Sequence, residues 1–298
     1  MPRVIILTLS DPTARPGGCD GCDCATETPR VPVLACAAAL SDAGAVPEPL
    51  TACDDAAIDS ALKPVLAGEA RLVVAAADDA QLRAVVRRMV RILAPPPSKR
   101  PAELPEGRTV FDLPPLGVLP LTPGIPELVP ALGLPTDAGA VAQAVLGETV
   151  RRFDLLRNDG GSVTLHGTLI GGVTAEGRPG SWRGRIEVDD AILSGGEEPI
   201  LACSIRNIGA SDVDGLPLVT AARPDDGRVD VAVAVPVLKR RLIRTASVHV
   251  EVRRASGRAV SVSPRDSVYL VDDGVTAQLG RKRAWWIERG AWAVYTLA

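Results

Sequence analysis

Three cysteines lie within six residues near the start of the chain, in the stretch PGGCDGCDCATE at 16–27. The chain has only six cysteines in 298 residues, so this segment concentrates its thiols. Thiolates at such short spacing can share a tetrahedral zinc ion or an iron–sulfur cluster, or can cycle between dithiol and disulfide. The CxxCxC spacing of Cys19, Cys22 and Cys24 offers three ligands, so a fourth must come from elsewhere in the chain.

The overall composition limits the partners of the protein. A formal net charge of -3 and a pI near 5.6 argue against nucleic acid, because phosphate binding requires a basic face. No apolar run approaches the roughly 18 residues of a membrane-spanning helix, and the apolar stretch after Met1 is too short for a signal peptide. We therefore expect a cytoplasmic protein without a transmembrane segment, in which cysteines stay reduced and serve metal or redox chemistry.

The first half of the chain, residues 1–150, alternates short apolar runs with helical patterns. This alternation predicts an α/β domain with a parallel sheet. Helical spacing predicts helices over 30–42 and 82–93, and Thr136 is the expected N-cap of a helix that ends at Gly147. The expected strands are the apolar runs at 4–9, 46–51, 72–76 and 116–121.

The second half, residues 151–298, changes to a period of two, with a hairpin signal at Asn158–Gly161. This pattern predicts an antiparallel β domain, a sandwich or a barrel. The tryptophans at 285, 286 and 292 are expected to pack the closing strands. The expected fold class is therefore α/β + β: an N-terminal parallel-rich α/β sheet domain followed by an antiparallel β-sandwich domain.

Four phrases, in chain order, resemble the diacylglycerol kinase family, lipid kinases that share a fold with sphingosine kinases and NAD kinases. VVAAADDAQLRAVV at 73–86 resembles the family's strand, GGDGT loop and following helix. PPLGVLPL at 114–121, followed by ALGLP, resembles the sequence that brackets the family's GTGND motif. AARPDDGRVDV at 221–231 resembles the stretch ending in DGxLDV, and Asp273–Gly274 resembles the DGE near the C-terminus. The resemblance implies a lipid-kinase-like fold over the whole chain.

The resemblance also implies where the site of a kinase stands in this sequence. Asp79 falls on the aspartate of GGDGT, with Asp78 as the alternative register. Asp273 corresponds to the aspartate of DGE and is the expected vestigial catalytic base. The implied nucleotide-binding positions are Asp11, Asp79, Thr122 and Gly124, of which Asp11 stands where the family has its NPxSG loop.

Each motif departs from the family's pattern. The glycine loop has become AADDAQ, which has no glycine to let the backbone approach a phosphate and which adds a carboxylate. TPGIPE at 122–127 lacks the asparagine of GTGND, and its prolines remove backbone donors. The final motif reads Asp273–Gly274–Val275, without the acidic partner. We therefore expect a degenerate kinase-like protein without activity. The alternative is an active ATP- and magnesium-dependent lipid or NAD kinase with divergent loops, and lipid is a partner only in that alternative.

The predicted fold also places the cysteine segment. It follows the first strand, at the carboxyl edge of a parallel sheet, where such folds bind ligands. Cys53 follows the second strand at the same edge. Cys36 is its substitute as a ligand if the next helix begins close to the cysteine segment. Apart from that case, Cys36 is expected to be a small core residue, as is Cys203. A redox pair and a loop without a ligand are the alternatives to a metal site, and a binding role toward a protein partner or complex is also open. The expected zinc or Fe–S ligands are Cys19, Cys22, Cys24 and Cys53.

Overall fold

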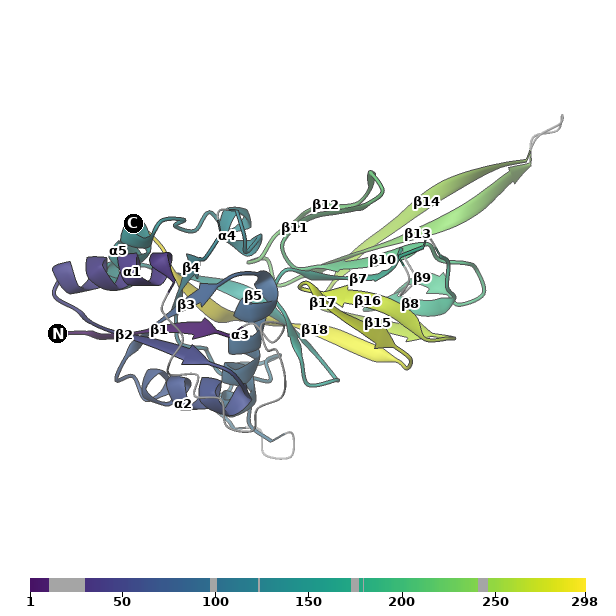
Figure 1. The fold of residues 1–298 in the computed structure, drawn as a ribbon. Helices are drawn as coiled ribbons and strands as arrows, with labels where there is room; N and C mark the ends of the chain where they lie inside the picture. Colours follow the sequence, from purple (N-terminus) through teal and green to yellow (C-terminus); the bar gives the residue numbers. More distant parts are fainter. Residues whose placement is uncertain (11–29, 97–100, 123, 173–176, 179, 241–245) are drawn as a thin grey trace, which may run out of the picture. The chain divides into compact units, whose positions relative to one another are not determined.

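The computed structural model describes residues 1–10, 30–96, 101–122, 124–172, 177–178, 180–240 and 246–298 (Figure 1). They divide into two compact units, Met1–Phe153 with Ala291–Ala298, and Asp154–Gly290. Two strands, β5 (Val150–Asn158) and β18 (Arg283–Tyr295), pass from one unit to the other. The end of the chain returns to the first unit because Val294 pairs in parallel with Leu116. The expected second domain of 151–298 therefore loses its last residues to the first unit.

The first unit is built on a parallel sheet in the order β2-β1-β3-β4, followed by the end of β18. All four strands expected in this half are present. Val4 to Leu7 are fully buried, as expected for a central strand of a parallel sheet that is covered on both faces. The strands are β1 (Arg3–Leu9), β2 (Val46–Ala52), β3 (Arg71–Ala76) and β4 (Leu116–Pro120).

Helices cover both faces of this sheet (Figure 1). One face of the sheet shares a core cluster with α1 (Val31–Asp42) and α5 (Ala138–Gly147). The other carries α2 (Asp55–Leu66) and α3 (Asp79–Leu93), and the short α4 (Leu128–Ala131) precedes α5. None of the described helices is both long and apolar enough to cross a membrane.

Two helix predictions need correction. The N-cap of α5 is Asp137, not Thr136: the Asp137 carboxylate accepts a hydrogen bond from the Ala140 amide at 2.8 Å. Helix α2 was not among the predicted helices, and it contains a proline, Pro64. The helix tolerates Pro64 near its end, since Ile58, Leu62 and Val65 still share one buried face.

The second unit is a β-sandwich, as predicted. One sheet continues from the start of β18 through β15, β8 and β9, and the other has the order β14-β13-β10-β7-β16-β17. Their inner faces share one core that includes Ile170, Ile186 and Trp285. The strands are β6 (Val163–Thr164), β7 (Gly167–Gly171), β8 (Gly184–Val188), β9 (Ala191–Gly195), β10 (Ala202–Arg206), β13 (Val229–Arg240), β14 (Ala246–Gly257), β15 (Ala259–Pro264), β16 (Val268–Asp272) and β17 (Val275–Leu279).

A separate ribbon of β11 (Gly209–Val213) and β12 (Leu216–Ala222) packs against the second sheet through Leu218 and Val219. The expected hairpin after Asn158 joins β5 to β6. Trp285 and Trp292 are buried as expected, whereas Trp286 is partly exposed and lies beside Arg157.

Candidate functional site

The junction of β3 and α3 contains the segment that resembles the glycine loop of diacylglycerol kinases. Ala77 and Asp78 alone separate strand from helix, and Asp78 is the N-cap: its Oδ1 accepts a hydrogen bond from the Gln81 amide at 2.8 Å. Gln81 in turn accepts from the Ala77 amide through its Oε1 at 2.9 Å. Helix N-termini bind phosphate through such amides. In this protein, the N-cap side chain of Asp78 takes one of these helix amides, that of Gln81, and the Gln81 side chain takes the Ala77 amide just before the helix.

Asp79, the residue expected on the motif's aspartate, is the first residue of α3. Its Oδ1 accepts a hydrogen bond from the Leu128 amide at 3.2 Å, and a carboxylate oxygen of Glu127 lies within 4.8 Å of one of its own. Burial, with a smaller contribution from Glu127, raises the pKa of Asp79 to about 6. Two carboxylates at this distance oppose a phosphate group unless a cation intervenes.

In the segment expected to correspond to GTGND, a backbone hydrogen bond joins Thr122 and Ile125. The Ile125 amide donates to the Thr122 carbonyl at 3.2 Å, and Gly124 has a φ of +78°. This φ explains the glycine, because L-residues rarely adopt it. A Cβ at position 124 would meet no described atom within 4 Å, so close packing does not require a glycine here. Thr122 and Gly124 therefore have a turn-forming role, and their nucleotide-binding role stays a prediction.

Asp273, the expected vestigial base, is buried in the second unit. With Gly274 it forms the two-residue turn between β16 and β17, and both have positive φ, as in a type I′ hairpin. Its carboxylate accepts three backbone hydrogen bonds, at 2.6 Å from Leu165 and at 2.9 Å from both His166 and Gly167. These contacts give Asp273 a structural role; a role as a base stays a prediction.

The neighbouring residue reinforces the same contact. Asp272 Oδ1 accepts hydrogen bonds from the hydroxyl groups of Thr164 at 2.6 Å and Thr168 at 2.8 Å, and all three side chains are buried. The Asp272–Asp273 pair thus fixes the connection between β6 and β7 to the β16–β17 turn.

Of the expected metal ligands, Cys19, Cys22 and Cys24 lie outside the described residues, as does Asp11. Cys53 follows the end of β2, as expected. The Ser10 amide donates to the Ala52 carbonyl at 3.0 Å, so the chain enters the cysteine segment beside Cys53. Cys53 is disulfide-bonded. Because a metal requires thiolates, a four-cysteine site needs this bond to be reduced.

The two remaining cysteines are core residues, as predicted. Cys36 on α1 and Cys203 on β10 are both free thiols with no exposed surface. Burial raises the pKa of Cys36 to about 11 and that of Cys203 to about 12. Neither is poised to form a thiolate near neutral pH, and Cys36 is therefore a poor substitute ligand.

Aspartate caps recur at the carboxyl edge of the parallel sheet. Asp54 of α2, Asp78 of α3 and Asp137 of α5 each accept a hydrogen bond from the amide three residues on, at 2.7, 2.8 and 2.8 Å. An N-cap aspartate occupies the position an anion would take. None of the three caps was predicted from the sequence: Asp78 was considered only as an alternative position of the motif aspartate, Asp54 was overlooked, and Thr136 was expected in place of Asp137.

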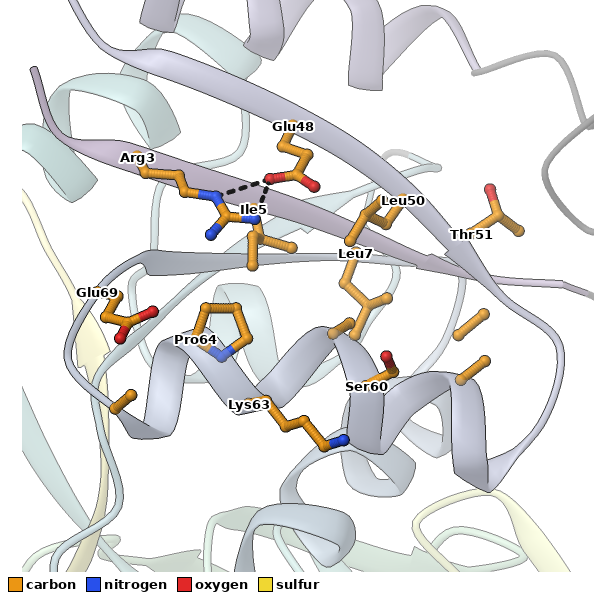
Figure 2. A pocket seen from close by; sticks show the side chains of 14 residues that line it. Arg3, Ile5, Leu7, Glu48, Leu50, Thr51, Ser60, Lys63, Pro64 and Glu69 are labelled. Atoms are coloured by element: carbon orange, nitrogen blue, oxygen red, sulfur yellow. Dashed lines mark hydrogen bonds and ion pairs between the residues drawn. The ribbon is translucent and has the colours of Figure 1, made fainter.

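A groove of about 800 Å³ lies between the β1–β2 edge of the first unit and α2 (Figure 2). Ile5, Leu7 and Leu50 form its apolar wall, and the Arg3–Glu48 ion pair, at 2.6 Å, closes one end. Of the expected nucleotide-binding residues that the structure describes, Asp79, Thr122 and Gly124, none lines this groove.

The comparisons bear on the fold. No model of a known protein family matches the sequence, and no curated protein matches it. A diacylglycerol kinase structure from Bacillus anthracis str. Sterne matches with a TM-score of 0.62 at 14% identity, covering 99% of this chain and 97% of that chain. Another structure from this organism, titled as a candidate diacylglycerol kinase, matches with a TM-score of 0.64 at 13% identity and the same coverage. The chain therefore has the fold of diacylglycerol kinases, as its motifs predicted.

Proposed function

We propose that this chain is a non-catalytic protein with a diacylglycerol kinase-like fold, whose former nucleotide cleft now serves as a binding site. The cysteine segment with Cys53 is the proposed site of a zinc ion, an Fe–S cluster or a protein partner. The observation that carries the proposal is the N-terminus of α3, where Asp78 and Gln81 occupy amides that a bound phosphate would need.

Charge supports the same conclusion. Asp79 and Glu127 place two carboxylates beside this helix start. A triphosphate would meet them without a basic residue of the same loop to compensate, since AADDAQ contains none. The residues present therefore do not fit ATP.

Isothermal titration with Mg-ATP tests the absence of nucleotide binding. We expect no binding, and no phosphorylation of diacylglycerol or NAD. A variant carrying Ala77→Gly, Asp78→Gly, Ala80→Gly and Gln81→Thr restores GGDGT around Asp79. We expect no binding by this variant either, because the turn at 122–127 still lacks the asparagine. Thermal melting of both proteins establishes that they are folded. Micromolar binding of ATP by the wild type would overturn the proposal.

An active kinase with divergent loops is the second candidate. It is favoured by the retention of Asp79 and Gly124 at their motif positions. Its signature is nucleotide binding that depends on magnesium and is lost in Asp79→Asn. The first candidate instead predicts stoichiometric transition metal in reduced protein that was purified without a metal-binding tag, and no response to nucleotide.

A further inference from the structure

The outer edge of β14 is an unprotected β-strand edge. β14 ends its sheet and has β13 as its only partner among the described strands. It is 12 residues long and contains no proline. Exposed strand edges pair with other strands unless they are shortened, bent or blocked.

The other described sheet edges are protected. β9 and β17 have five residues each. β2 carries Pro47 and Pro49; the Val46 amide bonds toward the β1 side, to Pro2, so by alternation both prolines face the open edge and offer no donor. β14 alone among these edges is both long and free of proline.

Hydrogen bonding identifies the open groups of β14. The Leu201 amide donates to the Ala234 carbonyl at 2.8 Å, so Ala234 of β13 faces β10 and not β14. Val252 lies opposite Ala234 in the antiparallel register. It is therefore in a non-hydrogen-bonded pair, and its amide and carbonyl face outward. By alternation, the backbone groups of Val248 and Val250 face outward too.

Part of this edge also lacks support from a third strand. β10 pairs with β13 only as far as Ala234, whereas β13 and β14 continue together to the Arg240–Ala246 pair. We name residues 235–240 with 246–251 the outer arm; in Figure 1 it extends beyond the neighbouring strands of its sheet. Two-stranded ribbons are marginally stable in water. Val250, in this arm, is 40% exposed.

We propose that β14 pairs antiparallel with β14 of a second copy of this chain, which forms a two-fold symmetric dimer. The side chains that alternate with Val248, Val250 and Val252 along β14 can pair with the same side chains of a second copy. An antiparallel pair centred on Val250 places Glu251 of each copy opposite His249 of the other, where a carboxylate can accept a hydrogen bond from an imidazole N–H. A pair centred on Val252 places Glu251 opposite Arg253 of the other copy; within one chain Glu251 and Arg253 already form an ion pair at 2.9 Å, so the two ion pairs would join into one network of alternating charge. Opposite charges across a strand pair stabilise it, and isologous contacts close after two copies.

Light scattering during size exclusion tests the dimer with the full chain. Wild type at about 100 µM should show twice the 31.0 kDa mass of one chain. Val250→Pro removes an outward amide that is opposite Pro236 and is not used by β13, so the variant should remain folded and become monomeric. Val250→Thr keeps the amide and should dimerise as the wild type does.

Hydrogen exchange provides the second measurement, which does not depend on any variant. In the dimer the amides of Val248, Val250 and Val252 exchange slowly at high protein concentration and faster on dilution. A monomeric wild type, a Val250→Pro variant that still dimerises, or fast exchange at these three amides at high concentration would each overturn the proposal.

Discussion

The Leu128 amide donates a hydrogen bond to the Asp79 carboxylate at 3.2 Å, which joins the first turn of α3 to the start of α4. Asp79 is also partly buried near Glu127, and its pKa is raised from 3.8 to about 6. The carboxyl group that accepts this hydrogen bond is therefore protonated more readily in the folded protein than in the unfolded chain.

Asp79→Asn should stabilise the protein above pH 6. Because the folded pKa of Asp79 exceeds its unfolded value, this group's contribution to stability is fully present below pH 3.8 and is lost as pH rises through about 6. Asparagine cannot ionise, and its Oδ1 can still accept the Leu128 amide. The melting temperature of the variant should therefore exceed that of wild type at pH 8 by more than at pH 4. Asp78→Asn, which removes one charge from the same turn and keeps the cap, is the control. An equal difference at both pH values would contradict this prediction.

Asp273→Asn should destabilise the second unit. The carboxylate accepts amides from Leu165, His166 and Gly167, and an asparagine directs an NH₂ group at one or more of them. An unsatisfied buried donor costs about 1–3 kcal/mol, measurable by denaturant unfolding. Asp214→Asn is the matched control: it changes the exposed first residue of the similar Asp–Gly turn between β11 and β12. We expect that control to stay within about 0.5 kcal/mol of wild type. If both variants had the same free energy of unfolding, the hydrogen bonds of Asp273 to the three amides would not contribute to stability as proposed.

Arg88→Ala should destabilise the first unit by about 2 kcal/mol, because charge-assisted hydrogen bonds of a buried guanidinium are lost. Arg88 of α3 is 9% exposed and donates to Asp59 at 2.6 Å and to Asp55 at 2.8 Å, both on α2. Arg87→Ala removes only an exposed ion pair with Asp55 at 3.1 Å and should cost under about 1 kcal/mol. Thermal or urea unfolding compares the two. Similar losses would mean that the α2–α3 contact does not depend on the buried guanidinium.

The cysteines should separate into two classes in reduced, native protein. Cys36 and Cys203 should resist a thiol reagent near neutral pH, since both are buried and their pKa values are raised to about 11 and 12. Metal analysis then tests the proposed site: Cys22→Ser and Cys53→Ser should lose the metal, whereas Cys203→Ser should keep it. Wild-type protein without stoichiometric metal after reduction would rule out the metal site and leave the partner or redox role.

The strands of the first unit could be predicted because their apolar runs are short and bounded, and burial on both faces permits no alternation. Helix α2 could not be predicted, because a proline inside a helix is unfavourable and the helix is stabilised by tertiary packing of its buried face. The sandwich followed from the change of period after residue 150. The short strands β9, β11, β12 and β17 escaped prediction because they carry few alternating apolar residues.

The candidate site was less predictable, because its residues act through contacts that are remote in sequence. Asp273 meets amides more than 100 residues earlier in the chain, which no local pattern encodes. Gln81 was overlooked, although an aspartate followed three residues later by glutamine is a capping signature.

The turn at Asp273–Gly274 bears on how sequences of this fold diverge. Its aspartate fills a left-handed position and satisfies three buried amides, so selection for folding alone preserves both letters of the pair. A lineage that loses catalysis would keep this dipeptide while its phosphate loops drift. Persistence of Asp–Gly at this place therefore carries no information about whether a descendant is an enzyme, and the glycine loop after β3 is the more sensitive marker.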